Sequence, residues 1–401
     1  MFEQAITAMA SVMVDPHLLG LIFVTTILGV IIGVLPGLGA TTGAALLLPF
    51  TLTMDPVHAI AVLATIYVSA TFAGSITAIL INAPGTSAAA ATTFDGYPLA
   101  QKGEAGRALG VAVVASTVGG IFSVLILCFA APMLARVAYE FRSPEYFALT
   151  VFGLSMLASI SAGGAVKNLM GGIFGVWLST IGAERVTGIE RFMFGNYELY
   201  EGLHFVPIFI GLFAISELLV QSKTVDKIIK TVAMKAVKLP TKEDYKKIWK
   251  TILRSCGIGT FIGVLPAEGA TVASMIGYSE ARRWSKNKEE FGKGSIEGIA
   301  GAEAANNAAT GGAMVPTMVL GIPGSGTTAI ILVGLMVHGL RPGVYLFTEQ
   351  VEKVYQIFGS MFVANVMFML MGLYAAKLFA RVSLVPTQIL WPIVFALSVI
   401  G

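Results

Sequence analysis

The chain has 401 residues, of which 56% are hydrophobic and 12% are charged, and its formal net charge is +3. A soluble globular domain carries about 25% charged residues, so this composition excludes an ordinary soluble protein. Apolar stretches of roughly 20 residues, the length that spans a bilayer as a helix, recur from Leu18 onward. We therefore expect an all-α polytopic membrane protein.

The sequence gives no sign of a cleaved leader, a disulfide framework or a resident cofactor. No basic residue precedes the first apolar stretch, so we expect no removed signal peptide. Cys128 and Cys256 lie far apart in or beside apolar segments, and the four histidines show no ligand spacing. We expect no bound metal beyond a sodium ion.

Residues 15–107 form the first predicted repeat, in which two motifs interrupt apolar sequence. The motifs are Gly-Val-Leu-Pro-Gly-Leu-Gly-Ala-Thr-Thr-Gly (33–43) and Asn-Ala-Pro-Gly-Thr-Ser (82–87). Proline and glycine break helices and free backbone N–H and C=O groups, which in hydrocarbon must be satisfied by protein, water or a ligand. The first motif predicts a re-entrant hairpin and the second predicts a broken helix.

Residues 108–221 are predicted to be scaffold helices that surround the repeats or form an oligomer interface. We expect four crossings, at Ala108–Leu134, Pro144–Ile160, Leu169–Ile181 and Phe205–Val220. The loop Glu184–Glu201 is expected on the outer side. Four crossings place the preceding loop, Asp95–Arg107, on the same side as the segment that follows them.

Residues 222–250 form a basic segment. Ten of the 26 basic residues lie between Lys223 and Arg254, and short loops rich in lysine and arginine stay in the cytoplasm. Its lysines alternate with isoleucine and valine, which predicts an amphipathic helix at the inner membrane surface. We expect no nucleic-acid partner for this segment.

Residues 251–345 repeat the two motifs of residues 15–107. Gly-Val-Leu-Pro-Ala-Glu-Gly-Ala-Thr (263–271) follows the first hairpin motif by 230 positions, and Ile-Pro-Gly-Ser-Gly-Thr-Thr (322–328) follows the first break by 239. The basic segment precedes the second hairpin but follows the first break, so the repeats are expected to be inverted in the membrane. Paired broken segments in inverted halves are typical of the binding site of a secondary transporter. Residues 354–401 are predicted to be further scaffold helices.

The breaks supply the predicted substrate site. A helix that restarts after a glycine presents free N–H groups and the positive end of its dipole, which favour anions such as carboxylates, and glycine lets a ligand approach the backbone closely. The alternative is that the breaks are structural kinks whose hydroxyls satisfy local backbone groups. The predicted substrate-binding residues are Thr41, Thr42, Asn82, Gly85, Thr86, Ser87, Thr271, Gly324, Ser325, Gly326, Thr327 and Thr328.

A coupling cation, sodium or a proton, is expected beside this site. Backbone carbonyls near Gly39 and Gly269 and the side chains of Asn306 and Asn307 are oxygen donors in apolar sequence; the alternative for both asparagines is an interhelical hydrogen bond. Glu268 and Glu303 are each interpreted as either a coupling-proton site or a solvated rim charge, and the rim is favoured for Glu268.

The same motifs carry a resemblance to a known family. With Asp-Gly-Tyr-Pro-Leu-Ala (95–100), Glu-Ala-Ala-Asn-Asn-Ala (303–308) and Gly-Ile-Pro-Gly-Ser-Gly-Thr-Thr-Ala (321–329), the chain resembles the large membrane subunit of the tripartite tricarboxylate transporters. The resemblance implies a bacterial inner-membrane transporter that works with a small membrane subunit. It also implies that a periplasmic binding protein delivers the carboxylate and that a cation gradient drives uptake. Members of that family usually continue beyond the equivalent of Gly401, so this member is either short or C-terminally incomplete.

Inverted repeats favour transport by alternating access, and an elevator-like motion is expected by analogy with other transporters that contain hairpins. Three other functions are less consistent with the sequence. A channel for ions or organic anions also uses broken helices, but no ring of like charge is evident. A membrane enzyme is disfavoured because Gly-Thr-Ser-Ala (85–88) has no partner base. A structural anchor would not need hydroxyls at its breaks.

Overall fold

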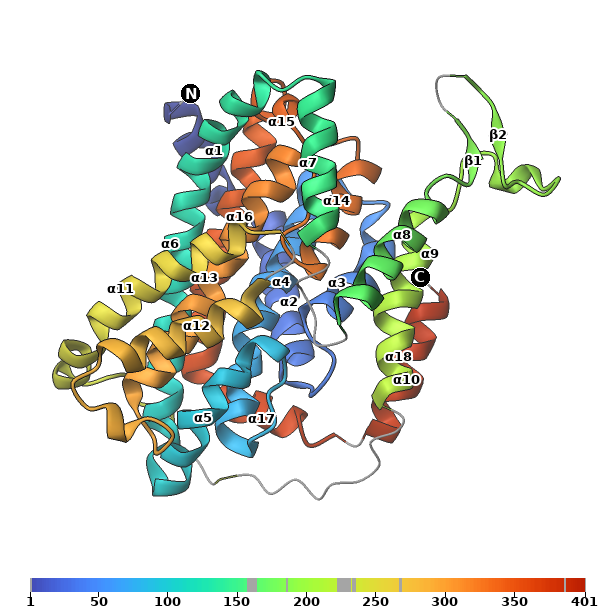
Figure 1. Ribbon diagram of the computed structural model, residues 1–401. Helices are drawn as coiled ribbons and strands as arrows, with labels where there is room; N and C mark the ends of the chain where they lie inside the picture. The colour runs from blue at the N-terminus through green and yellow to red at the C-terminus, as the bar shows by residue number, and fades with distance from the viewer. Residues whose placement is uncertain are drawn as a thin grey trace.

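The computed structural model describes residues 2–156, 164–184, 187–221, 232, 236–266, 269–385 and 387–400. These residues are almost entirely helical, which confirms the all-α fold (Figure 1). Within them, the strands are limited to the short antiparallel pair β1 (Gly182–Ala183) and β2 (Glu190–Arg191). Four of the described helical segments are long and apolar enough to cross a membrane: Pro16–Val34, Pro56–Ile81, Ser87–Tyr139 and Val351–Tyr374.

The first half contains the hairpin and the broken helix that the sequence predicts. Helix α2 begins behind Asp15, whose carboxylate accepts from the N–H groups of His17 and Leu18, and ends at the Pro-Gly turn. Helix α4 ends at Asn82, which has a left-handed φ of 56°. The elements are α1 (Phe2–Val14), α2 (Pro16–Val34), α3 (Ala40–Thr51), α4 (Pro56–Ile81), η1 (Ser87–Ala89), α5 (Ala90–Leu99) and η2 (Ala100–Glu104).

The second half repeats this order with different capping residues. Thr241 and Asp244 form a capping box that starts α11, and Ser295 caps α13. Helix α13 ends at Gly321, where a φ of 69° suits glycine. The elements are α11 (Lys242–Val264), α12 (Gly269–Trp284), η6 (Lys288–Glu290), α13 (Ile296–Leu320) and α14 (Gly326–Val337).

The duplication extends from the motifs to the helix packing. Helix α2 crosses α4, and α11 crosses α13. A Cβ atom placed on Gly33 would collide with the Ala70 carbonyl oxygen, and one on Gly263 would collide with that of Ala309. These glycines are related by the offset of 230 and these alanines by the offset of 239. Each hairpin therefore lies against its long helix through the same close backbone contact.

The two halves are interleaved. Helix α14 of the second half packs on α3 of the first, and α12 of the second half packs on η1 and α5 of the first. Each hairpin thus meets the broken segment of the other half. This exchange brings the four interruptions of the sequence to one place in the molecule.

The basic segments lie together near η2 and the start of α6. Arg107 Nη2 lies 2.5 Å from Asp244 Oδ1, and its Nη1 lies 2.7 Å from Glu104 Oε2. Lys102 Nζ donates to the Lys293 carbonyl at 2.6 Å. The two segments for which the sequence predicts one membrane face, residues 95–107 and the basic segment, therefore touch each other through Arg107 and Asp244.

Two predictions of local structure differ from the described residues. Residues 95–107, expected to form a loop, are helical through α5, η2 and the start of α6, with a kink at Gly103 (φ 85°). The amphipathic helix expected at 222–250 is not formed over 236–241, where the chain has no regular secondary structure and packs against α6. Gly106 and Gly110 leave room for it, and the Lys238 N–H donates to the Gly106 carbonyl at 2.9 Å.

The rest of the basic segment, residues 222–250, lies partly outside the described residues and partly in α11. Residues 222–231 and 233–235 lie outside the described residues. From Lys242 onward the chain belongs to α11, which continues through residue 250 without a break. The helix that enters the second hairpin therefore starts within the basic segment.

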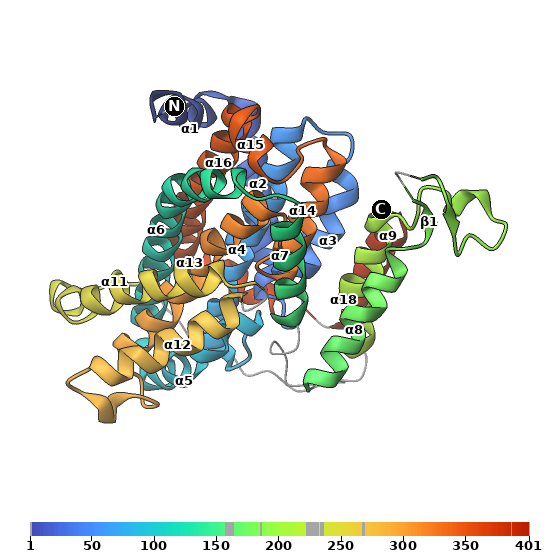
Figure 2. The same ribbon diagram turned by 45° about the horizontal axis from the view of Figure 1, so that its top comes forward.

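The remaining helices surround this interleaved unit. Helices α8, α9, α10 and α18 form a group beside it, and α9, η5 and α18 contact α3 (Figures 1 and 2). The predicted crossing Pro144–Ile160 is described only to Met156, in α7. The elements are α6 (Ala105–Tyr139), α7 (Ser143–Met156), α8 (Ala165–Leu178), η4 (Tyr197–Leu199), α9 (Phe205–Phe209), η5 (Ile210–Ile215), α10 (Ser216–Gln221), α15 (Val344–Thr348), α16 (Val351–Tyr374), α17 (Ala376–Val382) and α18 (Thr387–Ile400).

Candidate functional site

Two hydroxyl pairs join the halves where the hairpins meet the broken segments. Thr41 Oγ1 lies 2.9 Å from Thr327 Oγ1, and Ser87 Oγ lies 2.9 Å from Thr271 Oγ1. Thr41 and Thr271 are equivalent at the offset of 230, and Ser87 corresponds to the residue before Thr327 at the offset of 239. The two pairs are therefore nearly symmetric, and each contains one hairpin residue and one break residue.

The two pairs belong to one site. A Cβ atom on Gly269, at the start of α12, would lie 3.6 Å from Ser325 Cβ. Ser325 Oγ lies 3.3 Å from the hydroxyl of Tyr67, and a Cβ atom on Gly326 would lie 3.3 Å from Thr41 Oγ1. The starts of α3, α12, α14 and the η1–α5 segment are thus neighbours.

This arrangement can favour an anion without basic side chains. The four interrupted segments contain no lysine or arginine. The caps of α3 and η1, Gly39 and Thr86, make no side-chain hydrogen bond to the first turn, whereas Ser325 caps α14. Free N–H groups at converging helix N-termini attract a negatively charged group. The chemistry that fits is the binding of an anion by backbone N–H groups and hydroxyls.

The predicted substrate residues divide by their surroundings. Ser87 and Gly326 are exposed, so the hydroxyl pairs reach the surface of the fold. Asn82 is also exposed and ends α4. The hydroxyls of Thr42 and Thr328 already have hydrogen-bond partners within the protein. Thr42 Oγ1 donates to the Phe213 carbonyl at 3.5 Å, and Thr328 completes the capping box with Ser325.

Thr86 is a buried hydroxyl of the first break. It is 8% exposed, and its Oγ1 has no hydrogen-bond partner among the described residues. A Cβ atom on Gly74 would collide with this oxygen, so Thr86 packs closely on α4. Thr86 therefore leaves a buried, unpartnered hydroxyl at the start of η1.

Gly85 and Gly324 are closely surrounded by protein atoms. They were expected to let a ligand approach the backbone. A Cβ atom on Gly85 would instead collide with the Gly33 carbonyl, and one on Gly324 would lie 2.9 Å from the Gly263 carbonyl and 2.8 Å from Ala313 Cα. The space beside each glycine is filled by the end of the helix that enters the hairpin, so these glycines hold the site together.

Of the four predicted cation residues, Asn306, Asn307 and Gly269 are buried and Gly39 is partly exposed. Asn306 is fully buried, and neither its Oδ1 nor its Nδ2 has a partner among the described residues. Asn307 Nδ2 donates to the Glu303 carbonyl at 3.1 Å, while its Oδ1 is unpartnered. Gly39 and Gly269 lie at the starts of α3 and α12, with φ angles of 27° and 57°.

Glu303 is not a rim charge. Its side chain is 0% exposed, and it accepts hydrogen bonds from Thr92 Oγ1 and from Ser116 Oγ, the latter at 2.7 Å. Burial excludes the solvated interpretation for this residue. Glu268, for which the rim was favoured, lies outside the described residues.

Sequence reasoning missed three residues at the site. Tyr67, beside Ser325, is the first-half equivalent of Asn306, so the repeat alignment already pointed to it. Phe213 of η5 lies near Gly326, where a Cβ atom would be 3.6 Å from its ring. Ser116, beside Glu303, comes from α6. Neither of the last two lies in a repeated motif, so no sequence signal identified them.

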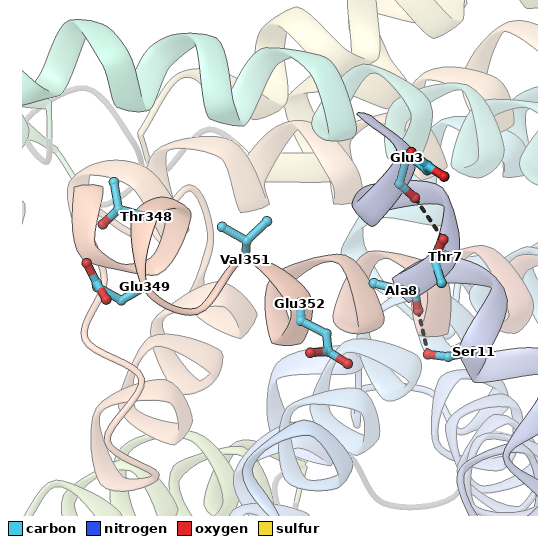
Figure 3. A pocket seen from close by; sticks show the side chains of 8 residues that line it. All are labelled: Glu3, Thr7, Ala8, Ser11, Thr348, Glu349, Val351 and Glu352. Atoms are coloured by element: carbon cyan, nitrogen blue, oxygen red, sulfur yellow. Dashed lines mark hydrogen bonds between the residues drawn. The ribbon is translucent and has the colours of Figure 1, made fainter. Parts of the chain in front are cut away.

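A separate pocket lies between α1 and the α15–α16 region (Figure 3). Its lining contains three carboxylates, from Glu3, Glu349 and Glu352, and no residue of the breaks. Acidic side chains repel an anion, so this pocket does not suit the ligand that the helix N-termini favour. Among the described residues, no group of three or more His, Cys, Asp or Glu side chains is placed to hold a metal ion.

A family model described as "Tripartite tricarboxylate transporter TctA family" matches residues 19–401. The chain belongs to this family. The match covers both repeats, so the resemblance carried by the sequence motifs is confirmed. The TctA family is a transporter family, which agrees with a membrane protein rather than with an enzyme.

Two similar proteins from Agrobacterium vitis extend the comparison. An "Uncharacterized 52.8 kDa protein in TAR-I ttuC' 3'region" is 40% identical over 381 residues, which cover 94% of this chain and 76% of the relative. An "Uncharacterized protein in TAR-II ttuC' 3'region" is 36% identical over 143 residues, covering 36% of this chain and 59% of that relative. No solved structure matches the chain.

Proposed function

We propose that this TctA-family chain is the large membrane subunit that carries a di- or tricarboxylate across a bacterial inner membrane by alternating access. The observation that carries the proposal is the meeting of four helix starts, joined by the pairs Thr41–Thr327 and Ser87–Thr271. A carboxylate between them would accept hydrogen bonds from these hydroxyls and from the free N–H groups of α3 and η1. A periplasmic binding protein would deliver it, and a small membrane subunit would complete the transporter.

The interleaving of the halves supports alternating access. Helices α3 and α14 pack together, and α12 packs on η1 and α5, so the site lies between two similar pairs of segments. In an inverted repeat, one pair leads from the site toward each membrane face, and small relative movements open one side while closing the other. An elevator-like motion is one way to achieve this.

A coupling cation is part of the proposal because the site lacks basic side chains. Transfer of a di- or tricarboxylate from water into a membrane-embedded site costs several kcal/mol of binding free energy unless its charge is neutralised. Each helix dipole end contributes roughly 0.3–2 kcal/mol, which is too little alone. Carbonyls near Gly39 and Gly269 and the unpartnered amide of Asn306 are candidate cation ligands.

Uptake into vesicles tests the proposed function. The chain is produced together with a small membrane subunit and a binding protein of the same transporter type, and uptake of labelled di- and tricarboxylates is measured with and without an inward sodium gradient and a pH gradient. We expect accumulation above equilibrium that requires the binding protein and a cation gradient. Equilibration without accumulation would indicate a channel, chemical conversion an enzyme, and no uptake by the complete system an anchor.

Labelling from each side of the membrane tests the inverted topology. Single cysteines are placed at Gln101, Lys242, Asn196 and Arg341, all exposed, in a background without Cys128 and Cys256. An impermeant maleimide should label the first two only from the cytoplasm and the last two only from outside, because the basic segments stay inside. Labelling of positions 101 and 341 from the same face would refute inverted repeats.

A further inference from the structure

We propose that Glu303, Thr92, Ser116 and Asn307 form a sodium-binding site between α5, α6 and α13. The site lies deeper than the helix starts at which a carboxylate would bind. Its binding of sodium stands independently of transport, and only its role in coupling rests on the proposed function.

The first argument is the way three helices enclose one carboxylate. Glu303 of α13 is 0% exposed, and its partners Thr92 of α5 and Ser116 of α6 are 1% and 0% exposed. Both hydroxyls donate to the Glu303 carboxylate. The cluster therefore joins a helix of the first half, a helix of the second half and the long scaffold helix.

The second argument is charge. The ion pairs found among the described residues join other side chains, and none reaches Glu303. A buried carboxylate without a counter-charge costs several kcal/mol, and each hydrogen bond to it returns only about 1.5–3 kcal/mol. One bound monovalent cation would neutralise the site.

The third argument is the kind and placement of the donor atoms. The site offers two carboxylate oxygens and two hydroxyl oxygens, and hard cations prefer oxygen ligands. Asn307 lies one helical turn after Glu303, and its Oδ1 has no partner among the described residues. A single carboxylate suits a monovalent ion, because divalent ions are held by more charge.

The fourth argument is that the fold does not require this carboxylate. The first-half equivalent of Glu303 at the offset of 239 is Ala64 on α4, which is also fully buried. The same helix position is thus occupied by a methyl group in one half and by a carboxyl group in the other. Packing of the repeat alone therefore leaves the acid unexplained, whereas ion binding accounts for it.

The position of Thr92 connects the cluster to the helix starts. Thr92 follows Ser87 by five residues in the continuous η1–α5 segment, and Ser87 contacts Thr271 of the second hairpin. An ion held by Thr92 and Glu303 would fix η1–α5 against α13 and keep Ser87 beside Thr271. Sodium should then raise carboxylate affinity, and carboxylate should raise sodium affinity by the same factor.

Thermal unfolding and direct binding of radioactive sodium test the site with purified protein and no carboxylate. The melting temperature is measured against sodium chloride at constant ionic strength, with choline chloride or potassium chloride as the replacement. We expect the wild type to be stabilised progressively by sodium, since an ion that binds only the folded state raises its stability. Thr92→Val and Ser116→Ala should each raise the half-saturating sodium concentration about tenfold.

Substitution of the acid gives the decisive comparison. Glu303→Gln keeps the size and polarity of the side chain but removes its charge and one acceptor oxygen, so the sodium response should disappear. Glu297→Gln is the matched control, because Glu297 lies on the same helix and accepts from Ser285 Oγ at 2.5 Å; it should respond to sodium as the wild type does. If Glu303→Gln does not fold, the binding of radioactive sodium to Thr92→Val and Ser116→Ala decides the question.

Several outcomes would overturn the proposal. They are the absence of a sodium response in the wild type, an unchanged response in Glu303→Gln, and an equal response to potassium. Stabilisation by low pH instead of sodium, lost in Glu303→Gln, would assign a proton to the site and reject sodium. Sodium binding without carboxylate uptake would retain this site and reject the proposed function, so the two failures can be distinguished.

Discussion

Replacing Gly85 by valine is expected to abolish carboxylate uptake and to lower the melting temperature of the protein. Even the first side-chain carbon at this position would collide with the backbone carbonyl of Gly33. A backbone oxygen cannot rotate away, so the end of α2 and the hairpin behind it must shift. Overpacking of this kind costs about 1–3 kcal/mol, and the shift would separate the helix starts that form the site.

Gly324, the equivalent glycine of the second half, should be less sensitive to substitution than Gly85. At Gly324 the added carbon would lie 2.8 Å from Ala313 Cα and 2.9 Å from the Gly263 carbonyl, a milder overlap than at Gly85. Gly324→Ala should therefore lose less activity and less stability than Gly85→Ala. Uptake and melting temperature, measured on the same preparations, check the order.

Gly20→Val is the matched control for both positions. Gly20 lies in α2, where an added carbon meets nothing within 4 Å, so uptake and stability should stay close to those of the wild type. Wild-type uptake by Gly85→Val would show that the contact between the break and the hairpin is not needed. Loss of uptake in Gly20→Val would show that the assay reports general damage to α2.

The repeated motifs predicted the local interruptions because proline and glycine act through the backbone itself. The Leu-Pro motifs end α2 and α11, and Asn82 and Gly321 end α4 and α13. These effects need only neighbouring residues, so one sequence suffices to locate them. The all-α membrane fold followed from composition, and the family from the same motifs.

The interleaving of the halves was not predictable from the motifs. An offset relates positions along the chain, but it does not say that α14 packs on α3 or that Ser87 meets Thr271. Which segments pack together is determined by contacts between side chains that are distant in the sequence. The contact of Gly85 with Gly33 was not predictable for the same reason, because Gly33 is distant in sequence.

The burial of Glu303 was likewise not predictable from the sequence. From the sequence, an acid near a polar stretch of α13 fits a rim as well as a buried site. Its burial depends on α6, which contributes Ser116, and on α5, which contributes Thr92. The inversion of the repeats and the identity of the coupling cation stay predictions, since both depend on the membrane and on bound ions.

Removing one hydroxyl from either of the two nearly symmetric pairs is expected to weaken carboxylate binding to a similar extent. Thr271→Val and Thr327→Val keep the size of the side chain while deleting the oxygen that lies 2.9 Å from Ser87 or Thr41. A hydrogen bond to a charged group contributes about 1.5–3 kcal/mol, so each variant should raise the half-saturating carboxylate concentration about tenfold or more. The concentration dependence of uptake at saturating sodium measures this directly.

Thr93→Val supplies the control that separates ligand binding from local structure. The Thr93 hydroxyl donates to the Ala90 carbonyl within its own helix at 2.6 Å, so its loss should leave carboxylate affinity unchanged. If the hydroxyl pairs only hold the halves together, Thr271→Val and Thr327→Val should lower the melting temperature without carboxylate and leave the half-saturating concentration unaltered. If they bind the ligand, stability without carboxylate should change little, and the stabilisation that carboxylate provides should fall in both variants. Because each variant removes one hydroxyl from one of the two nearly symmetric pairs, a large effect in only one variant would contradict a site to which both pairs contribute equally.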